Sequence, residues 1–459
     1  MNPVFGADPW WLVLIKIVVL VVFLLTFTIF NVWFERRVIG KMQHRKGPIM
    51  NGPFGLGQAL ADGTKALLKE DFRPKGADRV IFTLAPIITG TAAFTAWSVM
   101  PLGGEVTIFG VKTMLQLTDL PMGVLFILSV AAVGIYGIVL AGWASTSEYS
   151  LIGSIRSTAQ MISYEIAMGL SLVSVFMYAG SMSTSDIVGA QTQLWGVLPG
   201  AKFPSWYFIL LLPAFIIYVI SMIAETNRAP FDLVECEQEL VSGYITDYSG
   251  FRYAVYFLAE YINMATVSGV ATTLFLGGYH APWPITPWLT QNSALAWVDK
   301  GWMGPVWFLI KVMLFIFFFI WIRGAVPRLR YDQFMHLGWK ALIPISLVWI
   351  VVVGVARVGA DEGWFSTRVL LIVAAIVVVA LLVLILWPVK DEEVRSEVSR
   401  VPSVKDGVFD PYEFGYPVPP MPGQRLPEFD EVELDIVDRD PGSGLVEVTA
   451  GSDDDGKED

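Results

Sequence analysis

Long blocks of apolar residues divide this chain into segments that each have the length of a membrane span. We place nine such blocks, at residues 10–34, 79–100, 121–143, 155–180, 204–225, 251–277, 304–322, 338–358 and 367–387. A helix needs about 20 apolar residues to cross about 30 Å of hydrocarbon. The first block contains a single charge, Lys16, and the alternation typical of β-barrel strands is missing. The pattern predicts an all-α polytopic membrane bundle of about nine transmembrane helices.

Basic residues are concentrated in two of the polar segments between the blocks. Segment 35–79 carries ten of them, and segment 323–340 carries four. A nine-span bundle places both segments on the same side of the membrane, while the opposite loops offer Lys112, Lys202 and Lys300. Because loops rich in Lys and Arg stay in the cytoplasm, we expect the N-terminus outside and the C-terminus inside.

Residues 56–69 have the periodicity of an amphipathic helix. Its apolar face holds Leu56, Ala59, Leu60, Gly63 and Leu67, and its polar face holds Gln58, Asp62, Lys65 and Lys69. Such a helix lies in the membrane interface instead of spanning the bilayer. Packing against a soluble partner is compatible with the same pattern.

Charge and composition separate the last seventy residues from the rest. Residues 390–459 carry 7 basic and 20 acidic side chains, a net charge of −13, against −11 for the whole chain. This segment is also rich in proline, and such a composition does not bury enough apolar surface to fold. We therefore predict a transmembrane domain at 1–389 and a disordered acidic cytoplasmic tail at 390–459. The tail either stays solvated or docks on a basic partner.

Few residues of this chain could hold a redox cofactor. Cys236 is its only cysteine, and His44, His280 and His336 are its only histidines, all in predicted loops. An iron–sulfur cluster normally needs four thiolates, and a membrane haem needs histidines within the spans. No glycine-rich phosphate loop, metal-ligand spacing or Ser–His–Asp set is apparent. We expect no catalytic residue and no metal site, so that any redox cofactor belongs to another polypeptide.

Three ionisable residues fall inside predicted spans. They are Glu165 in the fourth, Glu260 in the sixth and Lys311 in the seventh. A charge in hydrocarbon costs several kcal/mol and usually faces a bundle interior or a water path. The alternatives for these residues are a proton route and a structural Glu–Lys pair. We favour a proton route, which leaves a secondary transporter or a membrane subunit of a larger energy-converting machine. A purely structural anchor for a peripheral enzyme would explain the basic loops but not these acids.

An acidic segment follows the fifth span and adds to this picture. Residues 225–250 contain six carboxylates against one base, Arg228. In a helical turn Asp232, Glu235 and Glu239 would share one face, where like charges repel unless they line water, pair with bases or are protonated. A solvated acidic loop explains the same spacing.

Four blocks of sequence decide between the classes. They read ERRVIG, QHRKGP and ADGTK at 35–65, GWAS and AQMISYE at 142–165, AETNRAPFDL and ELVSGY at 224–244, and RGAVPRLRYDQ at 323–333. Their order and content resemble the subunit 1 (H-type) family of NADH–quinone oxidoreductase, respiratory complex I. The resemblance covers roughly residues 1–360. It implies a proton-translocating complex in a bacterial cytoplasmic membrane, with this chain as a multi-pass component.

The resemblance also implies partners and residue roles. The chain would form a chamber where ubiquinone or menaquinone meets the last iron–sulfur cluster of a peripheral-arm subunit, with FMN and the other clusters also in partner subunits. Membrane lipid and other membrane subunits would surround it, and no nucleic acid is expected. Quinone-binding residues are expected at Glu35, Arg36, Arg45, Asp62, Arg228, Phe231 and Asp232. Proton-coupling residues are expected at Glu165, Glu225, Glu235, Glu237, Glu239, Glu260 and Lys311. Partner-facing bases are expected at Arg323, Arg328 and Arg330.

Quinone reduction offers a physical mechanism for such a chain. It takes up two protons and changes charge in a low-dielectric chamber, so nearby carboxylates respond in a coupled way. The acidic row would pass this change towards Glu165 and the pumping subunits. The alternative is a stand-alone cation/proton antiporter with Glu165 and Glu260 as carriers.

Overall fold

A computed structural model describes residues 8–192, 194–198, 201–232, 241–282 and 301–362 of the chain. The ninth predicted span (367–387) and the predicted tail (390–459) lie outside these residues. Glu235, Glu237 and Glu239 also lie outside them.

Helices make up most of the described chain. The longer ones are α1 (Trp10–Met42), α2 (Gly57–Leu68), α3 (Arg79–Ala96), α4 (Gly123–Ala144), α5 (Glu148–Ala179), α8 (Leu212–Glu225), α10 (Gly250–Phe275), α12 (Gly304–Ala325) and α14 (Ile343–Asp361). Among the described residues, six helical segments are long and apolar enough to cross a membrane: 10–42, 79–99, 123–144, 148–179, 301–325 and 331–359. The prediction of an all-α polytopic membrane protein is confirmed. The number of nine spans stays a prediction.

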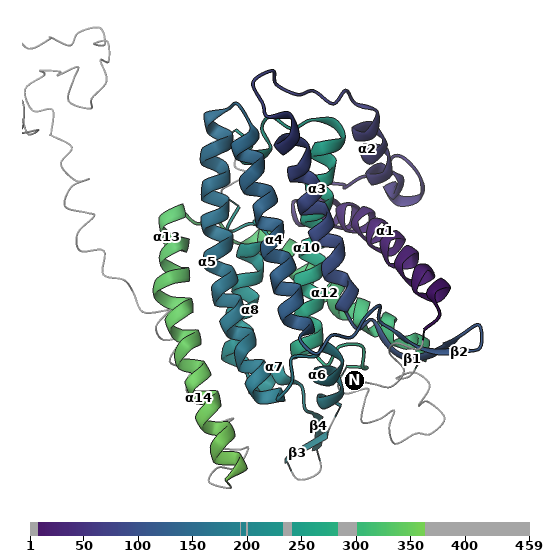
Figure 1. Ribbon diagram of the computed structural model, residues 1–459, viewed down its shortest axis with the longest axis vertical. Helices are drawn as coiled ribbons and strands as arrows, with labels where there is room; N and C mark the ends of the chain where they lie inside the picture. The colour runs from purple at the N-terminus through teal and green to yellow at the C-terminus, as the bar shows by residue number, and fades with distance from the viewer. Residues whose placement is uncertain (1–7, 193, 199–200, 233–240, 283–300, 363–459) are drawn as a thin grey trace, which may run out of the picture. The chain divides into compact units, whose positions relative to one another are not determined.

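Helix α10 lies at the centre of the bundle. It packs against α3, α12, α2, α1 and α8 (Figure 1). Its second half is buried on all sides and carries hydroxyl residues such as Thr266, Ser268 and Thr272, whose side chains donate to carbonyls one turn earlier in the same helix. Bonding of this kind satisfies a buried hydroxyl without a partner helix. This internal bonding allows α10 to be buried although its sequence contains many hydroxyl residues.

Helix α2 confirms the predicted amphipathic helix. Its apolar residues face outwards, with Leu60 57% and Leu67 59% exposed, while Asp62 on the polar face is half-buried and pairs with Arg36 of α1. No residue of α2 is fully buried, and exposed leucines on one face of a helix are unfavourable in water. The arrangement suits a helix whose outer face lies in the membrane interface.

The structure also contains two β-hairpins that the apolar pattern did not predict. Strands β1 (Gly103–Ile108) and β2 (Val111–Leu115) are antiparallel, as are β3 (Leu194–Leu198) and β4 (Ala201–Pro204). Phe109 and Gly110, between β1 and β2, both have positive φ, the geometry of a tight hairpin turn. Short helices α6 (Thr184–Ala190), α7 (Tyr207–Leu210) and α13 (Tyr331–His336) complete the connections.

Lys16 anchors the first hairpin to α1. Its Nζ donates to Asp8 Oδ2 and to Thr113 Oγ1, both at 2.6 Å. Its side chain is 11% exposed because the hairpin covers it.

Candidate functional site

Buried charges from four segments meet at the end of α1. Arg228 Nη1 lies 3.4 Å from Glu35 Oε1, and Arg228 Nε lies 2.9 Å from Glu260 Oε1. Arg323 of α12 also pairs with Glu35, and the Tyr261 hydroxyl donates to Glu35 Oε2 at 2.6 Å. The guanidinium of Arg228 lies 4.5 Å from the centre of the Tyr261 ring. We call these five residues the charge cluster.

Burial makes the charge cluster energetically demanding. The side chains of Glu35, Arg228 and Glu260 are 7%, 9% and 13% exposed. Charges this far from water are tolerated only when they are paired and hydrogen-bonded. The arrangement therefore fixes alternating charges in a region of low dielectric, where a new charge nearby would be felt strongly.

The turn after α8 holds Arg228 in place. Gln160 of α5 donates through Nε2 to the carbonyls of Ala224 (2.8 Å) and Phe231 (3.0 Å), on either side of the arginine. The ring of Phe231 packs against Tyr164 and Phe334, with centroids 5.5 and 5.9 Å away. This turn is thus clamped by a polar contact and by aromatic packing.

The other predicted chamber residues lie outside the charge cluster. Arg36 pairs with Asp62 of α2 at 2.6 Å, and the two side chains are 49% and 41% exposed. Asp232 is 9% exposed and lies 3.6 Å from Arg328. The exposed Arg45 donates to Gln43, two residues away. The structure brings Glu35 and Arg228 together directly and leaves these residues in separate pairs.

The predicted partner-facing bases divide in the same way. Arg323 belongs to the charge cluster although its side chain is 40% exposed, and Arg328 pairs with Asp232. Arg330 is exposed at the start of α13, where its backbone N–H donates to the Gln333 side chain. Two of the three bases therefore have partners within this chain.

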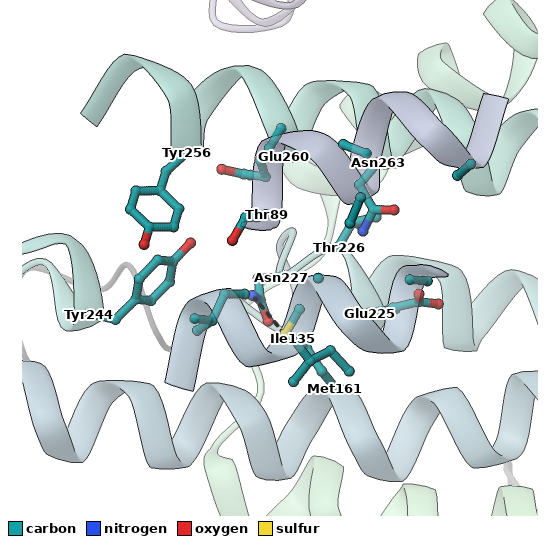
Figure 2. A pocket seen from close by; sticks show the side chains of 17 residues that line it. Thr89, Ile135, Met161, Glu225, Thr226, Asn227, Tyr244, Tyr256, Glu260 and Asn263 are labelled. Carbon is teal, nitrogen blue, oxygen red and sulfur yellow. Dashed lines mark hydrogen bonds between the residues drawn. The ribbon is translucent and has the colours of Figure 1, made fainter. Parts of the chain in front are cut away.

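A cavity of about 60 Å³ adjoins the charge cluster. Figure 2 shows Glu260 and Asn263 of α10 on its wall, together with Glu225 and Asn227 from the end of α8. The hydroxyls of Tyr244 and Tyr256 point towards each other at one end. A cavity of this size and polarity has room for a small number of water molecules. Glu260 thus links the charge cluster to the cavity.

Glu225 carries the polar path further into the bundle. It is 3% exposed, and its carboxylate interacts electrostatically with that of Glu165 on α5. Glu165 itself is half-buried near the middle of its helix. A second cavity, of about 20 Å³, is lined by Glu225, Asn263 and Tyr218 among others. Three carboxylates at positions 165, 225 and 260 therefore follow one another from the interior to the charge cluster.

Lys311 lines neither of the two cavities. Its Nζ donates to the carbonyls of Leu276 (2.6 Å), Gly278 (2.9 Å) and His280 (2.7 Å), just after the end of α10. It also lies 4.6 Å from the centre of the Trp206 ring. These contacts bind Lys311 to the turn that follows α10, and its proton-coupling role stays a prediction.

Three residues of the site had not been singled out from the sequence. Tyr261 directly follows the predicted Glu260, and that adjacency was an available signal. Asn263 lines both cavities. Asn31 is fully buried one turn before Glu35, and neither of its side-chain amide atoms has a hydrogen-bond partner among the described residues. No sequence pattern marked the two asparagines.

Comparison with known proteins identifies relatives over nearly the whole chain. The family model described as NADH dehydrogenase matches residues 15–354. A protein of Cutibacterium acnes, named as the H-type subunit of NADH-quinone oxidoreductase, is 55% identical over 429 residues, which are 92% of this chain and 94% of that protein. A protein of the same name from Streptomyces avermitilis is 50% identical over 427 residues, covering 92% and 90%. Among the described residues no group of three or more His, Cys, Asp or Glu could hold a metal ion.

Proposed function

The chain belongs to the NADH dehydrogenase family, and from this premise we propose that it is the complex I membrane subunit whose charge cluster borders the quinone-binding chamber. Quinone is its substrate, and the electrons come from an iron–sulfur cluster of a peripheral-arm subunit. FMN and the remaining clusters belong to other partners. The close relatives are named as a subunit of NADH-quinone oxidoreductase, which favours this function over a stand-alone antiporter.

One observation carries the proposal. The charge cluster at Glu35 and Arg228 is continuous, through Glu260, with a polar cavity that reaches Glu225. Reduction of a quinone adds negative charge and takes up protons. In a region of low dielectric that change alters the preferred charge state of nearby carboxylates. A quinone beside the charge cluster would therefore act on Glu260 first.

Protonation changes then pass along the row of carboxylates. Glu260 and Glu225 line the same cavity, and Glu225 interacts with Glu165. Each step connects neighbours through water or through electrostatic repulsion. Glu235, Glu237 and Glu239 belong to the same proposal by resemblance. The row would deliver the change to Glu165 and from there to the pumping subunits.

The quinone would enter beside α2. The apolar face of α2 is exposed, and its polar face meets α1 through the Arg36–Asp62 pair. A lipid-borne quinone would reach this helix from the bilayer along its exposed apolar face. In this arrangement the basic segment 35–79 faces the cytoplasm of a bacterial cell, and the tail 390–459 does as well.

Replacing Glu165 by glutamine tests the coupling role. Glu165→Gln keeps the size of the side chain and removes its ability to carry a proton, so the complex should assemble while NADH-driven proton pumping is lost. Glu148→Gln, at the exposed start of the same helix, serves as the control and should pump normally. We would measure quinone reduction and pH-gradient formation in membrane vesicles. A fully assembled Glu165→Gln complex with normal pumping would refute the proposed row.

A further inference from the structure

A second polar site lies on the outer surface of the bundle, away from the charge cluster. It is an open groove of about 810 Å³ between the first turns of α3 and α10. Its polar wall is formed by Arg73, Arg79, Arg252 and Asp71. Three guanidinium groups against one carboxylate give the groove a charge of about +2 at neutral pH. Neither the charge cluster nor the cavity beside it shares a lining residue with this groove.

Arg252 is the least exposed of the three bases. Its Nε lies 3.4 Å from Asp71, its Nη2 donates to Thr83 Oγ1, and its guanidinium lies 5.3 Å from the centre of the Phe82 ring. Phe82 in turn stacks on Tyr248, with centroids 4.0 Å apart. Burial raises the pKa of Tyr248 to about 12, so the Tyr248 hydroxyl stays neutral at pH 7 and does not compensate the charge of Arg252.

One donor of Arg252 is left over. Its Nη1 is buried and has no hydrogen-bond partner among the described residues. A buried guanidinium N–H without an acceptor is costly, because the group has lost its water. Arg252 itself lines the positively charged groove, and its guanidinium, fixed by the other contacts, still has a donor to offer. A guanidinium on the groove wall is suited to an anionic oxygen.

The other wall of the groove is apolar. Val80, Leu84 and Ile87 line it, and they are 71%, 46% and 52% exposed. Their spacing of four and three residues places them in one stripe along α3, which is among the helices apolar enough to span a membrane. Arg79 begins that helix, so the charged end of the groove lies where hydrocarbon gives way to the polar interface.

We propose that this groove binds the phosphate headgroup of an anionic phospholipid, with an acyl chain along the stripe Val80–Leu84–Ile87. Arginine suits a phosphate because its planar N–H groups match the phosphate oxygens. The net positive charge favours an anionic headgroup over a zwitterionic one. The apolar stripe favours a lipid over soluble phosphate, because phosphate has no acyl chain to pack against the stripe. Anchored in this way, the lipid would join the starts of α3 and α10 at the membrane surface.

Lipid binding to the assembled, detergent-purified and delipidated complex tests this site. We would titrate fluorescent dioleoyl phosphatidylglycerol and, separately, dioleoyl phosphatidylethanolamine, each with and without millimolar inorganic phosphate. Wild type should bind phosphatidylglycerol at least tenfold more tightly. Arg79→Gln with Arg252→Gln should weaken binding about 25-fold, about fivefold for each base. Arg357→Gln, an exposed arginine on α14, should leave binding unchanged. Should the double variant fail to assemble, Arg73→Gln alone should weaken binding about fivefold.

Each contrary result overturns the proposal. Equal binding of the two lipids removes the headgroup preference. Displacement by inorganic phosphate would assign the groove to a soluble anion. No saturable binding by wild type would mean that another polypeptide covers the groove. An effect of Arg357→Gln as large as that of the double variant would show that only overall charge matters. NADH:quinone activity of the variants should stay at the wild-type level, because none of these arginines lies in the charge cluster.

Discussion

Removal of the Arg228 guanidinium tests how the buried carboxylates are balanced. Arg228→Gln keeps a polar side chain of similar reach but eliminates the cation that contacts Glu35 at 3.4 Å and Glu260 at 2.9 Å. Glu35 retains Arg323 and the Tyr261 hydroxyl. We therefore expect the main loss at Glu260.

The distances set the size of the effect. At an effective dielectric of about 20, unit charges about 3 Å apart attract each other by about 5 kcal/mol. Much of this is offset by the cost of taking both charges out of water, and breaking a buried pair costs about 3–5 kcal/mol in practice. If Arg228 acts mainly on Glu260, adding Glu260→Gln to the Arg228→Gln variant should recover about 1–3 kcal/mol of the free energy that Arg228→Gln loses. This is the usual coupling energy of residues in contact.

A double-mutant cycle measures this coupling. The assay compares Arg228→Gln, Glu260→Gln and the double variant as purified, assembled complexes, by kcat/KM for quinone and by the temperature of thermal inactivation. If the two residues were independent, the fold-losses in kcat/KM of the single variants would multiply in the double variant. We expect the kcat/KM of the double variant to be about 5- to 150-fold above that value. Glu225→Gln combined with Arg228→Gln is the matched control. It removes a buried carboxylate of the same cavity, and we expect nearly additive effects.

Additive losses in the Arg228–Glu260 cycle would refute the reasoning. They would mean that the two residues act independently, despite their 2.9 Å contact. The charge cluster would then be a set of separate anchors and would offer no route from a quinone to the cavity.

Three further substitutions separate functional from structural roles. Tyr261→Phe removes a hydrogen bond to a charged group, worth about 1.5–3 kcal/mol, so kcat/KM for quinone should fall about 10- to 150-fold; an unchanged value contradicts a role for the hydroxyl. Asn31→Leu replaces a buried amide without partners among the described residues, so thermal stability should hold or rise while quinone kcat/KM falls; lower stability with normal kinetics would make Asn31 structural. Lys311→Met removes the donor to three carbonyls, so thermal stability should fall by at least about 3 kcal/mol while protons pumped per NADH stay constant. Lost pumping in a stable Lys311→Met complex would instead support the predicted proton-coupling role of this lysine.

The local sequence predicted the helices well because their cause is local. A run of about 20 apolar residues is stable as a helix across the bilayer. The helices α1, α3, α4, α5 and α12 and the helical segment 331–359 follow the predicted blocks. The 3.6-residue period of α2 was equally readable. The two hairpins were missed because short strands between spans leave little periodicity to detect.

Composition and motifs alone determined this protein's membrane character, its ionisable residues at Glu165, Glu260 and Lys311, and its family. The tertiary structure decided what each charge touches. Glu35 pairs with Arg228, which is 193 residues away, and with Arg323, which is 288 residues away. Lys311 bonds carbonyls after α10, although its sequence position resembles that of Glu260. The physical reason is range: hydrophobic length and helical period are properties of neighbouring residues, whereas the pairing of buried charges is fixed only when distant helices pack.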